Sequence, residues 1–433
     1  MYSLSLTADQ VVSSLLRLSE NEIVCILDSC GVGDGHSNLL LAGIRPKAVI
    51  ELSNDDPQKT LEALDGLLCG DQAVVFSISY DLGSRLHGIQ QREESPEPGV
   101  FAAAFDCLIQ HDYRSGATFL SGGETRVREI AILLSKNADP ISEPGPSKNT
   151  GVANSNFTAS EYKATVEAIR ELIRAGATYQ VNLTQQINVD LPVGMTPQLV
   201  FQRLRKDNPA AFSAFIKRRD STVVSASPER FIRLEGNSIF SSPIKGTRPR
   251  GRDSESDLAL RRELLASEKD RAENTMIVDL IRNDLGRICE FGSVYVERLC
   301  DLEEHPTLFH LVSTVRGELC PNLRVSDILR ATFPCGSITG APKIRTMQII
   351  DRLEPAVRGL SMGAIGYYLP KGVAQGSDPI LDLSVAIRTM VIRNDVATFN
   401  VGGGIVIDSD AADEYEESML KAEALLQALG SRT

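Results

Sequence analysis

Residues 225–250, SASPERFIRLEGNSIFSSPIKGTRPR, contain two β-prone runs on either side of the dipeptide Gly236-Asn237. Such a dipeptide between apolar runs is typical of a tight turn, so the stretch predicts a β-hairpin. A hairpin brings its outer ends together, which here would place the carboxylate of Glu229 near the amine of Lys245. An amine nucleophile and its proton-transfer partner need that arrangement.

The same stretch has a simpler interpretation. Lys245 lies between Ile244 and Gly246, where we expect a loop, and Arg248 and Arg250 follow. Lysines beside glycine and proline are mostly solvated. The stretch by itself therefore leaves two interpretations open, a catalytic pair and a plain cationic loop.

The composition is that of a globular protein that carries a net negative charge. The 433 residues are 42% hydrophobic, which is enough for a substantial core in one large domain or in two or three smaller ones. The 45 basic and 57 acidic residues give a net charge of −12, which argues against nucleic acid or an anionic membrane as the main partner. With no basic leader and no apolar run of about 18 residues, we expect a cytoplasmic protein.

The cysteines and histidines show no familiar metal or catalytic spacing. The eight cysteines are scattered, without a C-x-x-C pair, and the five histidines form no zinc pattern. We expect reduced, buried thiols. No Cys/His triad motif of a glutaminase is recognisable, so any ammonia that the protein uses would come from another chain.

The chain is expected to have three parts. A weakly marked N-terminal lobe, 1–140, is followed by a linker-like loop, 141–157, rich in proline and glycine, and by a region dense in motifs, 158–430. Long β-prone runs with single helices between them, and no regular βαβ alternation, favour an α+β fold.

The motif-rich region opens with a predicted helix and strand. Thr158 and Glu161 fit a capping box, and apolar residues then recur at helical spacing up to Gly176. The alternating segment that follows predicts a strand that carries Gln180 and Asn182.

Near the C-terminus, residues 380–392 and 396–401 are predicted strands joined by a turn at Asn394-Asp395. Arg388 falls inside the first of them. An arginine in an apolar strand needs a carboxylate partner, which either the protein or a ligand could supply.

Two predicted helices each place a pair of carboxylates on one face. Asp270 and Glu273 are three residues apart, as are Glu414 and Glu417, and Lys421 follows four residues later. If the helices faced each other, these groups could hold Mg²⁺, which prefers a few carboxylates completed by water and ligand oxygens. The alternative is two solvated helix faces with an ordinary Glu417–Lys421 ion pair.

Several glycine-containing segments could meet a ligand. In FPCGSITGAPK, Thr339 and Gly340 precede a helix that we expect to begin after Pro342, and its free N–H groups could bind a carboxylate. The spacing does not fit a phosphate-binding Walker loop. Gly363 and Gly403 would allow close approach of a ligand, although structural turns and bulges explain them equally well.

A series of motifs, in this order, resembles the chorismate-utilising enzyme family. They are SASPERF, PIKGTRPRG, AENTMIVDLIRNDLGR, HLVSTVRGEL, FPCGSITGAPKIRTMQIID, GAIGY, LSVAIRTM and VGGGIVIDSDAADEYEESMLKAEALL. The resemblance covers about residues 158–430, while the N-terminal part resembles the family only through LDSC at 27–30 and SYDLG at 79–83. It implies a two-lobed α+β fold in which large antiparallel sheets pack as a sandwich, with helices outside and the active site in a central cleft.

Within the family, the lysine in PIKGT and the segment TYQVNLTQ resemble the members that aminate chorismate at C4. Members that form anthranilate carry PIAGT, and isochorismate-forming members carry a lysine where Gln180 stands. The resemblance therefore implies synthesis of 4-amino-4-deoxychorismate for p-aminobenzoate and folate, with ammonia from a separate glutamine amidotransferase subunit in a heterodimer. An anthranilate-forming enzyme and a chorismate-binding subunit without turnover remain alternatives.

The resemblance also implies roles for individual residues. Lys245 would attack C2 of chorismate while the C4 hydroxyl leaves, Glu229 would act as general acid and base, and His310 would lie beside the reacting ring. From the sequence alone, a lone histidine among apolar residues is more often a core residue. The expected substrate-binding residues are Arg388, Lys421, Thr339, Gly340, Gly363, Gly403 and Gln180. The expected Mg²⁺ ligands are Glu273 and Glu417, with Asp270 and Glu414 behind them.

The sequence departs from the family pattern at two places. Ser361 stands where many members carry a tyrosine, which removes a ring from one wall of the expected site. Leu27-Asp28-Ser29 matches only part of the tryptophan-binding motif that many members have, so the sequence leaves open whether tryptophan is bound.

Overall fold

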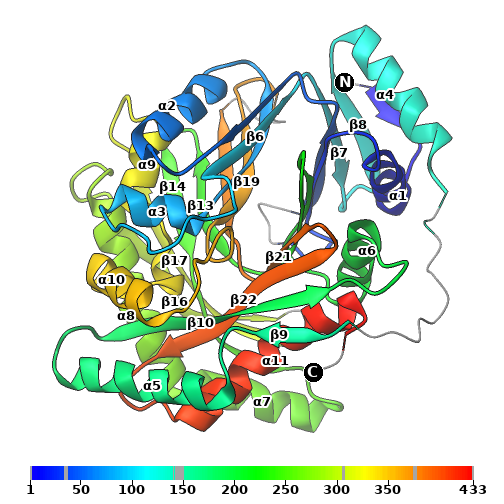
Figure 1. The fold of residues 1–433 in the computed structure, drawn as a ribbon. Coiled ribbons are helices and arrows are strands. Elements are labelled where there is room, and N and C mark those ends of the chain that lie inside the picture. Colours follow the sequence, from blue (N-terminus) through cyan, green and yellow to red (C-terminus); the bar gives the residue numbers. More distant parts are fainter. Residues whose placement is uncertain are drawn as a thin grey trace.

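The computed structural model describes residues 2–33, 38–139, 141, 151–304, 308–373 and 378–431. Within them, two large antiparallel β-sheets form the centre of the molecule and the helices lie outside (Figure 1). This is the α+β architecture expected from the sequence. Of the predicted linker, residues 142–150 lie outside the described part of the chain.

The larger sheet, sheet A, takes strands from both halves of the chain. Its order is β1 (Tyr2–Leu4), β8 (Ala117–Gly122), β7 (Cys107–Asp112), β3 (Leu39–Ile44), β2 (Val24–Asp28), β11 (Phe212–Lys217), β12 (Thr222–Ser227), β21 (Thr389–Arg393), β22 (Val396–Ile405), β10 (Gln180–Asp190) and β18 (Gly340–Ala341). A short strand, β9 (Ala153–Ser155), also pairs with β10.

The second sheet, sheet B, is also mixed in origin. Its order is β15 (Ile244–Pro249), β17 (Leu308–Glu318), β14 (Ser238–Ser242), β13 (Arg230–Glu235), β20 (Ile380–Val385), β19 (Ala364–Leu369), β5 (Ala73–Ile78), β6 (Val100–Phe105) and β4 (Ala48–Leu52). The edge strand β16 (Tyr295–Glu304) pairs with β17.

Helices cover the outer faces of both sheets (Figure 1). Against sheet A pack α1 (Ala8–Leu18), α4 (Glu124–Lys136), α5 (Ala159–Arg174), α6 (Pro197–Asp207), α10 (Lys343–Leu353) and α11 (Ala411–Leu429). On the side of sheet B lie α2 (Pro57–Leu68), α3 (Tyr80–Leu86), α7 (Ser254–Ala266), α8 (Glu268–Gly286) and α9 (Val325–Thr332). The predicted capping box is confirmed, because Thr158 and Glu161 cap the start of α5.

A buried apolar layer joins the two sheets and crosses the expected lobe boundary. Cys25 and Leu41 of sheet A meet Val75, Phe101 and Ile365 of sheet B in one cluster. The pairing is also continuous, because β2 pairs with β11 and β5 pairs with β19. The N-terminal 140 residues therefore supply strands to both sheets.

The chain passes from one sheet to the other at two places that lie side by side. Pro228 and Glu229 connect β12 of sheet A to β13 of sheet B, and residues 386–388 connect β20 of sheet B to β21 of sheet A. The predicted single strand over 380–392 is therefore wrong. Arg388 lies in the connection, with a left-handed φ of 48°, because the backbone must turn there to change sheets.

The predicted hairpin is confirmed, as β13 and β14 pair around a turn at Gly236, whose φ is 62°. The expected loop at Lys245 is wrong. This residue lies in the edge strand β15, which pairs with β17 and has a register irregularity between Ile244 and Thr247. Gly246 has a φ of 83° within that irregularity, so the glycine allows the strand to bend beside Lys245.

Candidate active site

The two connections between the sheets place Glu229 and Arg388 in one region. The backbone N–H of Val385 donates to the Glu229 carbonyl at 3.0 Å, and that of Ala226 donates to the Arg388 carbonyl at 3.0 Å. Because each connection is hydrogen-bonded to a strand that borders the other, both functional side chains start from a fixed backbone at the point where the sheets meet.

Glu229 and Lys245 lie close to the same short loop. Lys245 Nζ is 3.5 Å from the carbonyl oxygen of Ser337. The Glu229 side chain is 5% exposed, and its Oε1 has no hydrogen-bond partner among the described residues. Burial raises the pKa of Glu229, while a hydrogen bond from Ser337 and the charge of Lys245 oppose that rise. The site thus holds a carboxyl group that keeps its proton more readily than usual, within the field of an amine.

The loop that contains Ser337 is shaped by Gly340. This loop is the 3₁₀-helix η1 (Gly336–Ile338) followed by β18. A Cβ on Gly340 would lie 2.0 Å from the Gln180 carbonyl oxygen, and its φ is +134°, so a larger residue is excluded. The Thr339 hydroxyl lies within hydrogen-bond distance of two carbonyls of its own loop, 3.1 Å from that of Cys335 and 3.2 Å from that of Gly336.

Gln180 opens strand β10 on the other side of that loop. Its side chain is fully buried, and neither amide atom has a partner among the described residues. Asn182, two residues further on the same strand face, also has a buried Nδ2 without a partner. Buried amides are normally satisfied, so these two groups are available to hydrogen-bond a polar ligand or water.

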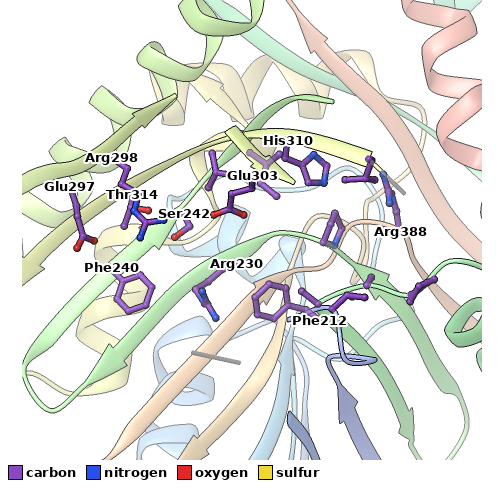
Figure 2. Close-up of a pocket in the computed structure, with 18 of the residues that line it drawn as sticks. Phe212, Arg230, Phe240, Ser242, Glu297, Arg298, Glu303, His310, Thr314 and Arg388 are labelled. Carbon is purple, nitrogen blue, oxygen red and sulfur yellow. The ribbon is translucent and has the colours of Figure 1, made fainter. Parts of the chain in front are cut away.

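His310 and Arg388 line a cavity of about 310 Å³ between the sheets. Figure 2 shows both at one end of it, with Arg298 at the other. His310 Nδ1 is 2.9 Å from the Thr247 hydroxyl. Glu229 and Lys245 are not among the described residues that line the cavity, but Ile244, next to Lys245, is. The cavity therefore reaches the backbone segments that carry Lys245 and Glu229, through their neighbours Ile244 and Pro228.

Arg388 has no acidic partner among the described residues. Its side chain is half-buried, and desolvation alone lowers its pKa. A desolvated guanidinium without an acidic partner favours binding of a carboxylate, because the carboxylate would replace the hydrogen bonds that the guanidinium makes with water when it is exposed. No protein carboxylate takes this place within the described part of the chain, so a ligand carboxylate as the partner of Arg388 stays a prediction.

The four acidic residues predicted from spacing lie on two helices, Asp270 and Glu273 on α8 and Glu414 and Glu417 on α11, and the α11 pair lies beside Gly403. A Cβ on Gly403 would be 3.2 Å from Glu414 Oε2 and 3.8 Å from Glu417 Oε1. The absence of a side chain on this buried glycine lets the carboxylates approach the sheet. Lys421 Nζ is 2.7 Å from Glu417 and donates to the Gly402 carbonyl at 2.9 Å.

The carboxylates affect one another electrostatically. Burial raises the pKa of Glu273, and Asp270 and Glu414 add to the rise, while Lys245 and Lys269 oppose it. Burial also raises the pKa of Glu414, which accepts a hydrogen bond from Ser409 at 2.7 Å.

Glu417 differs from its neighbours. Partial burial favours its neutral form, but the ion pair with Lys421 outweighs this and lowers its pKa.

A cation would be favourable among these groups, and Lys269 lies among them, as Lys245 and Lys421 do. Lys269 Nζ is 3.7 Å from Glu414. Burial lowers the pKa of Lys269, but Glu414, Glu273, Glu417 and Asp270 raise it further than burial lowers it. Within the described part of the chain, no three His, Cys, Asp or Glu side chains converge tightly enough to hold a metal. The oxygen donors nonetheless fit Mg²⁺, which needs few protein ligands when water and substrate complete its shell.

Gly363 and Ser361 lie in the segment that leads into β19. A Cβ on Gly363 would lie 2.1 Å from the Ile78 carbonyl oxygen, so only glycine fits there. Ser361 is buried, and its hydroxyl accepts the Asn400 backbone N–H at 3.2 Å. The serine at the expected tyrosine position therefore forms a hydrogen bond with the backbone of strand β22.

Two residues at this site were not among the expected site residues. Ser337 contacts Lys245 through its carbonyl and Glu229 through its hydroxyl. Asn182 shares a strand face with Gln180, and its Nδ2 also lacks a partner among the described residues. The alternation of β10 could have indicated Asn182 from its position two residues after Gln180. Nothing in the local sequence marks Ser337.

The fold and the site together define the class of protein. The chain belongs to the chorismate binding enzyme family, which it matches over residues 28–427. Among its relatives, aminodeoxychorismate synthase component 1 of Salmonella typhimurium is 43% identical over 387 residues, which are 87% of this chain and 83% of the relative.

Two further comparisons extend this result. Anthranilate synthase component I of Streptococcus pneumoniae, a solved structure, superposes with a TM-score of 0.77 at 27% identity and covers 90% of this chain and 92% of that one. Aminodeoxychorismate synthase of Streptomyces pristinaespiralis is 47% identical over 269 residues, which are 62% of this chain. The chain spans only 36% of the length of that relative. None of the described helices has the length and apolar character needed to cross a membrane.

Proposed function

We propose that this chain combines chorismate with ammonia to give 4-amino-4-deoxychorismate, a transaminase-class amination that supplies p-aminobenzoate and folate synthesis. The observation that carries the proposal is Lys245, which lies at the site next to Glu229 and Ser337. The similarity to relatives named aminodeoxychorismate synthase supports the same activity.

Substrate binding follows from the charges around the cavity. Chorismate carries two carboxylates, and Arg388 is a desolvated guanidinium without an acidic partner in the described structure. Its pairing with one substrate carboxylate would orient the ring between His310 and Lys245. Lys421 is the second candidate for a carboxylate, although here it is paired with Glu417.

The covalent step would use the amine and the carboxyl group in sequence. The neutral amine of Lys245 forms a bond to C2 of chorismate, the two ring double bonds shift, and the C–O bond at C4 breaks. The protonated Glu229 gives its proton to the departing hydroxyl, which leaves as water. Ammonia then forms a bond to C4, the double bonds shift back, and Lys245 leaves as an amine, while Glu229 recovers a proton from the ammonia nitrogen.

Mg²⁺ is part of the proposal. Glu273 and Glu417 would hold it, with Asp270 and Glu414 behind them, and the bound ion would neutralise a substrate carboxylate. Besides burial, Asp270 and Glu414 raise the pKa of Glu273, and Glu417 raises the pKa of Glu414. A cation among these carboxylates would relieve that repulsion. Gly403 has no side chain, which leaves room beside Glu414 and Glu417 for the substrate.

A separate glutamine amidotransferase subunit would supply the ammonia, in a heterodimer in the cytoplasm. The relatives named component 1 support a partner component. The proposal assigns no ammonia-generating site to this chain.

The test is to incubate the purified chain with chorismate, Mg²⁺ and ammonium at mildly alkaline pH, and to identify the product by chromatography with mass detection. We expect aminodeoxychorismate without pyruvate. Anthranilate together with pyruvate would reject the proposal in favour of the anthranilate-forming reaction. If no turnover occurs even with an amidotransferase present, the chain is a binding subunit.

A further inference from the structure

The segment SYDLG at residues 79–83 lies outside the motif-rich region, yet it packs against the site. Ser79 caps the short helix α3 by accepting the Leu82 N–H at 3.2 Å. The cap fixes the first turn of α3, where Tyr80 and Asp81 are buried. This segment belongs to the N-terminal part of the chain, and the mechanism above assigns it no role.

Its first contact is with the loop that leads to Gly363. The Tyr80 N–H donates to the Gly359 carbonyl at 2.9 Å, and the Gly359 N–H donates to Asp81 Oδ2 at 3.0 Å. These two bonds form a reciprocal pair between segments 278 residues apart. Gly363, four residues on, lies against the backbone of Ile78 at the end of β5.

Its second contact is with the loop before η1. A Cβ on Gly83 would lie 2.5 Å from Pro334 Cγ and 2.9 Å from Phe333 Cε1, so only glycine allows this approach. The same loop continues to Ser337, which contacts Lys245. One short segment therefore touches both backbone loops that surround the substrate site.

Asp81 is the polar centre of these contacts. It is completely buried, and its Oδ1 accepts a hydrogen bond from Gln91 Nε2 at 2.6 Å. The charged groups that face it are Arg358, stacked over the Tyr80 ring at 4.6 Å, and the more distant Glu354, Asp351, Arg92 and Glu93, which line the same 200 Å³ pocket. Burial raises the pKa of Asp81 to about 6, with hydrogen bonds from Ser95, Gln91 and Gly359 opposing the rise.

We propose that Asp81 is a positioning residue for chorismate binding, which acts through the Gly359 N–H to hold the loop that carries Gly363 against the site. The inference rests on the proposed use of chorismate as substrate, but not on the product that is formed. Its consequence is that a residue of the N-terminal lobe sets the affinity of a site built from the C-terminal region.

The test compares Asp81→Ala with a matched control, Asp65→Ala. Asp65 is also a buried carboxylate, and it accepts a backbone N–H, that of Ser326, at 3.0 Å, but it joins α2 to α9 away from the substrate loops. With Mg²⁺ present, the chorismate dissociation constant is measured by calorimetry, and the melting temperature of each variant is recorded. We expect Asp81→Ala to raise the dissociation constant at least tenfold, and Asp65→Ala to leave it within twofold while lowering the melting temperature comparably.

A conservative variant keeps the proposal testable if Asp81→Ala does not fold. In Asp81→Asn the amide oxygen can still accept the Gly359 N–H, and its NH₂ group can donate to Gln91 Oε1, which has no partner among the described residues. We expect near-parental affinity at pH 8. Below about pH 6, chorismate affinity should fall more steeply in the parent than in this variant, because protonated Asp81 is a weaker acceptor.

Equal affinity of all three proteins, or identical pH profiles of the parent and Asp81→Asn, would overturn the proposal. Dissociation constants do not depend on the product. A chain that bound chorismate but made anthranilate would therefore reject the proposed function and leave the role of Asp81 intact.

Discussion

Arg388 lies in a connection between two strands, although its apolar neighbours predict a regular strand. It lines the cavity and has no acidic partner in the described structure. We expect Arg388→Ala to weaken chorismate binding by roughly 10- to 100-fold, the usual value of a charged hydrogen bond of about 1.5–3 kcal/mol. The melting temperature should not fall, because no ion pair is lost.

Arg393→Ala is the matched control for Arg388. Arg393 lies five residues further along, at the end of β21, and pairs with Glu97 at 3.0 Å. This variant should lose stability and keep its chorismate affinity. A steady-state KM for Arg388→Ala equal to that of the parent would contradict the assignment.

Glu229 illustrates a conflict between stability and function. Burial raises its pKa, so the folded protein binds this proton more tightly than the unfolded chain does. Ionised Glu229 therefore destabilises the fold above its folded pKa, and the penalty disappears as the pH falls to the unfolded value of about 4.3.

We expect Glu229→Gln to abolish amination and to raise the melting temperature at pH 8, with the gain shrinking toward pH 4. Thermal unfolding followed by circular dichroism at several pH values measures this. A variant that is less stable than the parent at pH 8 would show that the carboxylate contributes to the fold.

At the residue scale, the sequence predicted which residues lie near one another better than it predicted their contacts. The hairpin signal at Gly236 correctly placed Glu229 in the neighbourhood of Lys245. It could not indicate that the Ser337 carbonyl would lie beside the amine, because the two residues are 92 positions apart. The roles of these residues stay predictions until variants are measured.

Helices α8 and α11 face each other through like charges, with Lys269 between them. We expect Lys269 to compete with a metal, so that Lys269→Met binds Mg²⁺ roughly three- to tenfold more tightly in the absence of chorismate. Calorimetry, or Mn²⁺ used as a paramagnetic probe, measures the affinity without any turnover.

The exposed Lys206 at the end of α6 provides the control, since Lys206→Met removes the same charge far from these carboxylates. Weaker metal binding by Lys269→Met than by Lys206→Met would mean that Lys269 helps to build the site rather than compete for it.

Elements with a local signal were predicted well, and elements set by the tertiary structure were not. The capping box before α5 and the turn at Asn394 are encoded within a few residues, and both are confirmed. The break at 386–388 was missed because the apolar pattern continues through it, while sheet B ends and sheet A begins there. Lys245 was expected in a loop because glycine and proline nearby are typical of loops, whereas its strand is set by the pairing of β15 with β17.

At the scale of the whole molecule, the shared sheets predict one cooperative unit. Because β2 pairs with β11 and β5 with β19, we expect far-UV circular dichroism and tyrosine fluorescence to report coincident unfolding transitions. Fragments 1–140 and 158–433, produced separately, should not fold. Two resolved transitions, or a fragment that folds by itself, would support the expected lobes as independent domains.

The architecture was predictable only as a class. Long β-prone runs without βαβ alternation indicated α+β, and the family resemblance implied the sandwich. The strand order was not encoded locally, because neighbours such as β12 and β21 are far apart in the sequence and pair through long-range contacts. The contact between Asp81 and Gly359 was hidden for the same reason.

The central claim is that Lys245 becomes covalently bound to chorismate, and peptide mapping tests it most directly. The chain is mixed with chorismate and Mg²⁺ without ammonia, quenched with acid and digested, and its peptides are analysed by mass spectrometry. We predict that the peptide containing Lys245 carries the mass of chorismate less one water, and that this modification disappears when ammonium is added before the quench. An unmodified Lys245 at every time point, in a preparation that aminates chorismate once ammonium is present, would contradict the account.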